Sequence, residues 1–238
     1  KEDSVATVML IFLGARDRLL ADGVATLAAH AGVPPETVVQ LTDLAEQALP
    51  RGREQIRARF RGEEPLVIGC SRPRAVRALL DFAGVDTTAR PIEWVALPFD
   101  REALRRESGV PWYPVIDRTL CTGCGTCREY CLFSVYGRTP GEQGVGPVRV
   151  VEPLYCKTGC PACARLCPVG ALIFPFCPEA ELNGEIETPA PQSNADLKRQ
   201  LGEDPLRLLT ERRKRRGLLD LSKFEQAEED RIRHSGVL

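Results

Sequence analysis

Apolar and polar residues along positions 1–110 form blocks that predict strands and helices in turn. Val5–Leu13 is an apolar run with β-branched residues, as in a buried strand, and Asp17–Ala31 reads as a helix that ends before Gly32. In Pro35–Leu49 the apolar residues recur with a 3.6-residue period, which predicts an amphipathic helix. Three further elements follow: a strand at Pro65–Gly69, a helix at Arg72–Ala83 and a strand at Ile92–Leu97.

Strands that alternate with helices imply that residues 1–110 form a small α/β domain with a parallel sheet, of flavodoxin-like or thioredoxin-like kind. The segment has no G-x-G-x-x-G or P-loop motif, so it carries no nucleotide-binding signature. Cys70 falls at a strand-to-helix turn, where open α/β sheets often place ligand-binding groups. Free cysteines are more often small buried hydrophobes, and we interpret Cys70 and Cys177 in that way.

Residues 111–178 contain shorter blocks, which predict a β-α-β-β-α-β pattern and hence an α+β module. Three of the four strands of this pattern are assigned, to Pro114–Asp117, Val148–Pro153 and Leu172–Pro175, and the predicted helices are Arg128–Tyr136 and Cys163–Leu172. Residues 179–195, rich in Pro, Glu, Gln and Asn, are typical of a linker.

A helical tail is predicted for residues 196–238. The pair Asp204 and Pro205 starts one helix, which Gly217 ends, and Ser222 opens an S-x-x-E capping box for the next. The basic run Arg212–Arg216 is typical of a solvated helix face, with contact to an acidic partner surface as the alternative. The tail is too small to fold alone, so we expect it to pack on the chain's own domains or on a neighbouring subunit.

Composition narrows the class of protein. The 238 residues are 43% hydrophobic and 27% charged, as in globular proteins. With 32 basic and 33 acidic residues the formal charge is −1, which gives no reason to expect nucleic-acid binding. The longest apolar run, Val8–Leu13, is too short to span a bilayer, and no signal peptide is visible, although the chain begins at Lys1 rather than Met. We expect a cytoplasmic protein without a transmembrane segment.

Eight of the ten cysteines lie in two dense runs. The first run, C-x2-C-x2-C-x3-C, comprises Cys121, Cys124, Cys127 and Cys131. The second, C-x3-C-x2-C-x3-C, comprises Cys156, Cys160, Cys163 and Cys167, with Pro168 after it.

This spacing is too dense for mutual disulfides, and a zinc site usually takes one C-x2-C pair from each of two hairpins. Three cysteines in one loop suit the corners of a 4Fe-4S cluster better, with the fourth cysteine of each run binding the other cluster. Gly123, Gly125 and Gly159 would let the backbone approach closely.

Residues 114–176 resemble the bacterial-type ferredoxins with two 4Fe-4S clusters, through the pieces CTGCGTCREYC and CKTGCPACARLCPVGALIF. The resemblance implies two 4Fe-4S clusters, one held by Cys121, Cys124, Cys127 and Cys167, the other by Cys156, Cys160, Cys163 and Cys131. Two positions depart from the family pattern. Three residues instead of two separate Cys156 from Cys160, and Leu132 replaces a proline that commonly follows the first run.

The resemblance implies electron transfer, with no catalytic residue. Many free ferredoxins are strongly acidic, whereas residues 117–177 carry six basic and four acidic side chains. We therefore expect an accessory subunit of a larger oxidoreductase complex, with a redox protein as partner. Two alternatives stay open: a regulatory or binding module with structural or sensory clusters, and, more weakly, an enzyme that uses Cys70 with electrons from the clusters.

Overall fold

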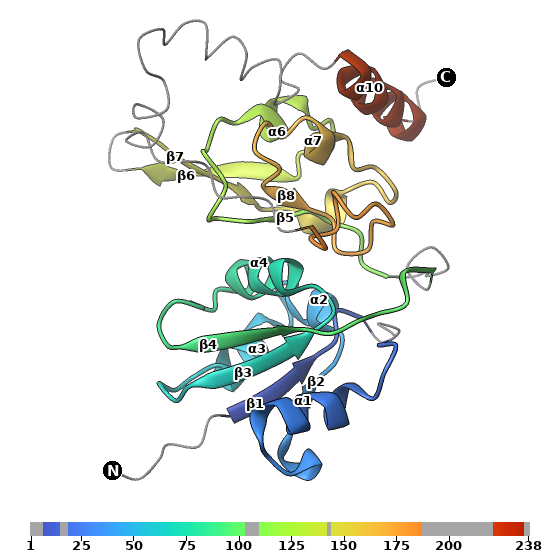
Figure 1. The fold of residues 1–238 in the computed structure, drawn as a ribbon. Coiled ribbons are helices and arrows are strands. Elements are labelled where there is room, and N and C mark those ends of the chain that lie inside the picture. Colours follow the sequence, from blue (N-terminus) through green and yellow to red (C-terminus); the bar gives the residue numbers. More distant parts are fainter. Residues whose placement is uncertain (1–6, 15–18, 103–109, 142–143, 187–220, 236–238) are drawn as a thin grey trace, which may run out of the picture.

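A four-stranded parallel sheet and a cysteine-rich part are stacked with helix α4 between them (Figure 1). The computed structural model describes residues 7–14, 19–102, 110–141, 144–186 and 221–235. We call the elements β1 to β4 with their helices the amino-terminal part, and the elements β5 to β8 the cysteine-rich part. The fold is thus mixed α/β, with a parallel sheet and several helices.

The sheet has the strand order β2-β1-β3-β4, and all of its pairs are parallel. Its strands are β1 (Thr7–Ile11), β2 (Val39–Leu41), β3 (Leu66–Cys70) and β4 (Ile92–Ala96). Every residue of β3 is buried, as expected for an inner strand with helices on both faces. The order reverses between β1 and β3, which is the arrangement of flavodoxin-like sheets.

Alternate residues of β1 pack into two separate cores, one on each face of the sheet. Met9 and Ile11 pack in the core that includes α2 (Leu44–Gln47), α3 (Arg53–Arg59) and α4 (Pro73–Ala83). Val8 and Leu10 face the opposite side and pack with α1 (Gly23–Ala31). This two-sided burial explains why β1 is a continuous apolar run.

Capping residues set the ends of two helices. The side chain of Asp22 accepts hydrogen bonds from Val24 N and Ala25 N at 3.0 and 3.2 Å, so α1 starts at Gly23, later than the predicted Asp17. Gly32 and Gly84 end α1 and α4 with φ of 67° and 86°, as left-handed glycine caps do.

The single helix predicted for Pro35–Leu49 is wrong. The segment forms a 3-10 turn, η1 (Pro35–Thr37), then the strand β2 and then the short helix α2, with Asp43 at φ 53° between them. Backbone pairing with β1, in which Val39 lies opposite Met9, outweighs the helical period. The helix α3 follows and was missed, because Arg53–Arg59 is mostly polar.

The cysteine-rich part has little regular structure. β5 (Val115–Ile116) pairs antiparallel with β8 (Leu172–Ile173), and β6 (Tyr136–Gly141) forms a hairpin with β7 (Gly144–Val150). The short helices are α6 (Thr126–Tyr130), the 3-10 turn η2 (Pro153–Tyr155) and α7 (Ala162–Arg165).

Three predicted elements differ here. The helix predicted for Arg128–Tyr136 ends at Tyr130, because Ser134 takes φ 55° and Tyr136 begins β6. The helix predicted for Cys163–Leu172 ends at Arg165, before the turn at Gly170 with φ 60°. The strand predicted for Val148–Pro153 begins earlier, at Gly144, and ends at Val150.

Parts of the chain after β8 also pack on the cysteine-rich part. Within the segment assigned to a linker, Leu182 O accepts a hydrogen bond from Phe174 N at 2.7 Å and Asn183 is fully buried. The tail contributes α10 (Leu221–Ser235), which contains Ser222 rather than being capped by it. The helix predicted between Asp204 and Gly217, with its basic run, lies outside the described residues.

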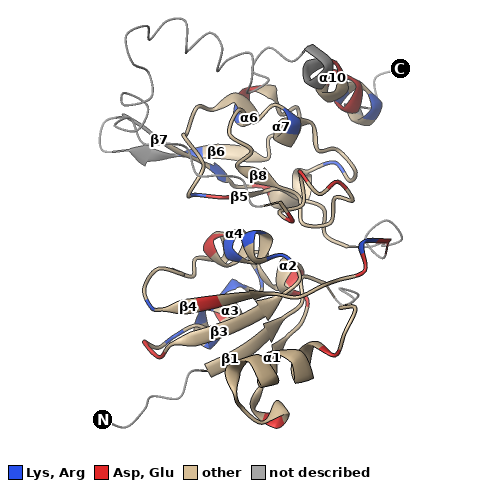
Figure 2. Cartoon of the chain, in the orientation of Figure 1, with Lys and Arg blue, Asp and Glu red and all other residues tan. Residues whose placement is uncertain are grey.

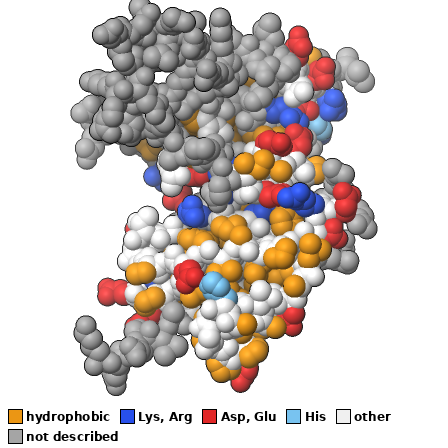
Figure 3. Space-filling model, in the orientation of Figure 1, with side chains coloured by type: hydrophobic (Ala, Val, Ile, Leu, Met, Phe, Trp, Pro, Cys, Tyr) orange, Lys and Arg blue, Asp and Glu red, His pale blue; other side chains and the backbone are white. Residues whose placement is uncertain are grey.

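One apolar core joins the two parts. Tyr113, Val115, Ile173 and Phe176 of the cysteine-rich part belong to the same cluster of buried side chains as the inner face of α4. Arg72 donates a hydrogen bond to Pro175 O, and the ion pairs Arg101–Glu185 and Arg118–Asp81 lie at the boundary, where Figure 3 shows acidic and basic side chains together.

Among the helices that the structure describes, none is long and apolar enough to cross a membrane.

Substitution of Tyr113 tests the contact between the amino-terminal part and the cysteine-rich part. Its hydroxyl donates to Ala45 O, and burial raises its pKa far above that of free tyrosine, so it remains a protonated donor. Tyr113→Phe leaves the Ala45 carbonyl unsatisfied and should lower the free energy of unfolding by about 1–3 kcal/mol in urea denaturation. Tyr155→Phe, at a side chain 62% exposed, is the matched control and should change it by less than about 0.5 kcal/mol. Equal losses in the two variants would contradict this role for Tyr113.

Candidate metal centres in the cysteine loops

The first cysteine run follows β5 as a tight loop. Its start is fixed by Asp117, whose backbone carbonyl accepts a hydrogen bond from Cys121 N at 3.0 Å. Gly123 and Gly125 then take φ of 71° and 91°, which residues with side chains rarely adopt. A Cβ at Gly125 would collide with the guanidinium of Arg138. The positive φ angles thus favour glycine at both turns of the loop, whereas the Arg138 side chain could move aside.

The second run winds around η2 and α7. Cys156 directly follows η2, and Cys163 lies on α7. Gly159 and Gly170 reverse the chain before and after this helix, with φ of 81° and 60°. The run therefore places its cysteines on two turns and a single helical turn rather than on one face of a long helix.

Cys127 identifies one set of neighbouring thiols. The pKa of Cys127 is raised to about 12, mainly by burial. The negative charges of three nearby thiolates contribute to this rise, those of Cys167, Cys124 and Cys121. These four cysteines, three from the first run and one from the end of the second, therefore lie together. We call them the first cysteine group.

Cys156 and Cys163 identify the other set. Burial raises the pKa of Cys156, and the charges of Cys160 and Cys131 add to it. Burial likewise raises the pKa of Cys163, together with the charges of Cys156 and Cys131. We call Cys131, Cys156, Cys160 and Cys163 the second cysteine group. The charge of Cys127, which belongs to the first group, also raises the pKa of Cys163, so the two groups lie close to each other.

Several sulfurs have hydrogen-bond partners that the cysteine spacing does not reveal. Ala171 N donates to Cys167 Sγ at 3.2 Å, and the Tyr136 hydroxyl lies 3.0 Å from Cys163 Sγ. The pKa of Cys124 is lowered, because hydrogen bonds from Thr126 and neighbouring amides outweigh the effect of burial, which raises it. Donors aimed at sulfur stabilise the thiolate, which is the form that binds metal.

The two cysteine groups differ in how far the rest of the protein buries them. Cys124 of the first group is exposed, whereas Cys160 and Cys163 of the second are buried. Helix α10 covers the second group: Ala227 is fully buried and packs with Cys160. Ion pairs and hydrogen bonds hold α10 in place, namely Arg165–Asp230 at 2.8 Å and Tyr130–Glu228 at 2.6 Å. Figure 2 shows the mixed charges of α10 beside α6 and α7.

The remaining two cysteines lie elsewhere. Cys70 ends β3 and is fully buried in the core between the sheet and α4, as expected for a small hydrophobe. Cys177 is buried in the core of the cysteine-rich part, and burial raises its pKa to about 11. Neither belongs to the two groups of four thiols.

Each group has four thiols, which is the number of protein ligands that a 4Fe-4S cluster takes. Within the described ranges, no three or more Cys, His, Asp or Glu side chains are close enough to bind one metal ion. A 4Fe-4S cluster takes one thiolate on each of its four irons, and therefore uses four spaced sulfurs. Metal binding would also replace the protons that burial and mutual repulsion hold on Cys127, Cys156 and Cys163.

Comparison with known proteins finds a local similarity. Over 45 residues the chain is 40% identical to the methylamine utilization ferredoxin-type protein MauM of Methylophilus methylotrophus and to that of Methylobacillus flagellatus. The match covers 18% of this chain and 20% and 19% of those relatives, respectively. No family model matches the chain, and no solved structure matches it significantly. The chain thus contains a segment similar to part of ferredoxin-type proteins.

The thiols should differ in reactivity after metal is removed by a chelator. Cys124 is exposed with a lowered pKa, so its alkylation rate should rise with pH around a midpoint below that of an ordinary thiol. Cys163 is buried with a raised pKa and should react last. Alkylation followed over time and pH by peptide mass spectrometry measures both rates, and equal rates for the two thiols in the folded chain would contradict this order.

Proposed function

We propose that this chain transfers electrons through two 4Fe-4S clusters, one on each cysteine group, as an accessory subunit of a larger redox complex. The observation that carries the proposal is the gathering of eight thiols into two neighbouring groups of four. The similarity of one segment to ferredoxin-type proteins supports it independently. Residues 111–178 would form the cluster domain and residues 1–110 an α/β domain attached to it.

The chain's own residues would hold, shield and tune the clusters. Bound clusters would supply reversible one-electron chemistry between a reduced and an oxidised partner protein. Buried side chains such as Val135 and Phe174 exclude water, and the resulting low dielectric disfavours the added negative charge of the reduced state. The hydrogen bond from Ala171 N to Cys167 Sγ acts in the opposite direction and favours reduction.

Exposed apolar side chains support a partner surface near the second group. Leu132, Leu154 and Tyr155 are 53%, 72% and 62% exposed, and they adjoin Cys131 and Cys156 in the sequence. Exposed apolar residues that gather in one region are typical of protein-binding surfaces. A redox partner bound there would lie close to the second cysteine group.

Metal analysis tests the proposal directly. Protein purified without oxygen should contain about eight irons and about eight sulfides per chain, and the reduced protein should give coupled spin signals by EPR. A reversible one-electron couple near about −400 mV would favour electron transfer over a structural or sensory role. Clusters that cannot be cycled without unfolding the chain would favour the regulatory module instead. Bound zinc without iron would overturn the proposal.

Cys156 is the ligand at which the spacing departs from the ferredoxin pattern, so it provides a sharper test. Cys156→Ser should remove one iron or the whole second cluster, leaving about seven or about four irons. Cys177→Ser changes a buried thiol outside both groups and is the matched control, which should keep the full iron content. An unaltered iron content and EPR spectrum in Cys156→Ser would show that Cys156 is not a ligand.

A further inference from the structure

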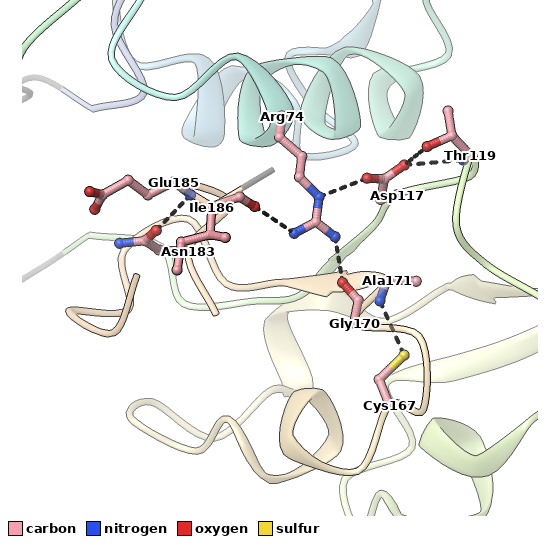
Figure 4. Close-up of polar contacts among 9 residues, drawn as sticks. All are labelled: Arg74, Asp117, Thr119, Cys167, Gly170, Ala171, Asn183, Glu185 and Ile186. Carbon is pink, nitrogen blue, oxygen red and sulfur yellow. Dashed lines mark hydrogen bonds and ion pairs between the residues drawn. The ribbon is translucent and has the colours of Figure 1, made fainter. Parts of the chain in front are cut away.

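Arg74 is a buried charge that belongs to one part of the molecule and binds the other. It lies in the first turn of α4, and its side chain is only 2% exposed. Its Nε donates to Asp117 Oδ2 at 2.8 Å, and its two terminal nitrogens donate to Gly170 O and Ile186 O. Figure 4 shows the guanidinium among these acceptors. All three lie beyond the amino-terminal part, and Asp117 and Gly170 are hydrogen-bonded through their backbone to Cys121 and Cys167 of the first cysteine group.

A single peptide group connects Arg74 to a cysteine sulfur. The carbonyl of Gly170 and the amide N–H of Ala171 belong to the same peptide group, so one end accepts from Arg74 and the other donates to Cys167 Sγ at 3.2 Å. A cationic donor at the carbonyl polarises the amide and strengthens its N–H as a donor. The charge of Arg74 thus acts on Cys167 through two hydrogen bonds.

The partner of Arg74 fixes a second cysteine of the same group. Asp117 N donates to Ala171 O at 2.8 Å, and Asp117 O accepts from Cys121 N at 3.0 Å. Asp117 Oδ1 also accepts from the amide and hydroxyl of Thr119 at 3.1 and 2.6 Å, which holds the carboxylate in place. Arg74 and Asp117 together therefore orient the backbone at both Cys121 and Cys167.

We propose that Arg74 is a positioning residue that raises the reduction potential of the cluster on the first cysteine group. This inference rests on the proposed function. The reduced cluster carries one more negative charge, which N–H donors to sulfur and a buried cation both stabilise. The amino-terminal part thereby contributes to electron transfer without contacting a cluster, because α4 supplies the charge. A partner that displaced α4 would shift the potential of this cluster.

Redox titration of the iron-loaded full chain tests the role of Arg74. In Arg74→Gln the first cluster should be about tenfold less reduced at a given potential, which is a midpoint about 59 mV lower for one electron. The midpoint of the other cluster should stay unchanged. Arg77→Gln is the matched control on the same helix, because Arg77 lies over the Trp94 ring at 5.1 Å and not at the cysteine loops. It should leave both midpoints unchanged.

The variant Asp117→Asn, which keeps Arg74, should shift the first midpoint in the direction opposite to that of Arg74→Gln. It removes the negative charge and leaves Arg74 uncompensated, so the first midpoint should rise. Arg74→Gln protein that keeps its iron but has the wild-type midpoints would overturn the inference. If Arg74→Gln does not fold, the double variant Arg74→Gln/Asp117→Asn, which removes both buried charges, decides: a first midpoint below that of Asp117→Asn supports the role of Arg74, and an equal or higher one overturns it. Wild-type protein without iron would instead overturn the proposed function.

Discussion

Crowding of buried thiols is the constraint on which the cysteine-rich part depends. Burial and the charges of neighbouring thiolates raise the pKa of Cys127, Cys156 and Cys163, and all of the eight thiols except Cys124 are partly or fully buried. Thiolates packed in this way need positive charge close by, which metal supplies in such sites. The loops are accordingly short and turn at glycines with positive φ, because regular helices or strands would carry the cysteines apart. Regular structure is confined to two-residue strands, a hairpin and single helical turns.

A part with so little regular structure does not build a large core by itself. It shares one with the amino-terminal part, where Tyr113, Val115 and Phe176 extend the apolar cluster beneath α4. Polar contacts reinforce the junction, and the buried pair Arg74–Asp117 is the most enclosed of these. A buried ion pair costs desolvation energy and is tolerated only when its geometry and hydrogen bonds are good, as they are here. The parallel sheet therefore serves as a support for the cysteine loops as well as a fold of its own.

The sequence predicts best where local signals agree. In α4, Pro73 at the start, Gly84 at the end and an apolar face all indicate one helix, and the structure confirms it. In Pro35–Leu49 the helical period is misleading, because the spacing that buries one helix face also suits a short strand followed by a helix. The spacing of the cysteines singled out all eight, whereas their division into two clusters comes from the resemblance and stays a prediction. The contacts of Arg74 could not be predicted, because Asp117 and Gly170 lie 43 and 96 residues away.

Helix α10 has a consequence for how the molecule is assembled. It covers the second cysteine group, yet it follows both cysteine runs in the sequence and is synthesised after them. During synthesis both cysteine loops are therefore complete while their cover does not yet exist, and the sulfurs of the second group are open to solvent. Once Asp230 pairs with Arg165, α10 closes over them. The order of the sequence thus separates a stage in which these thiols are accessible from one in which they are covered.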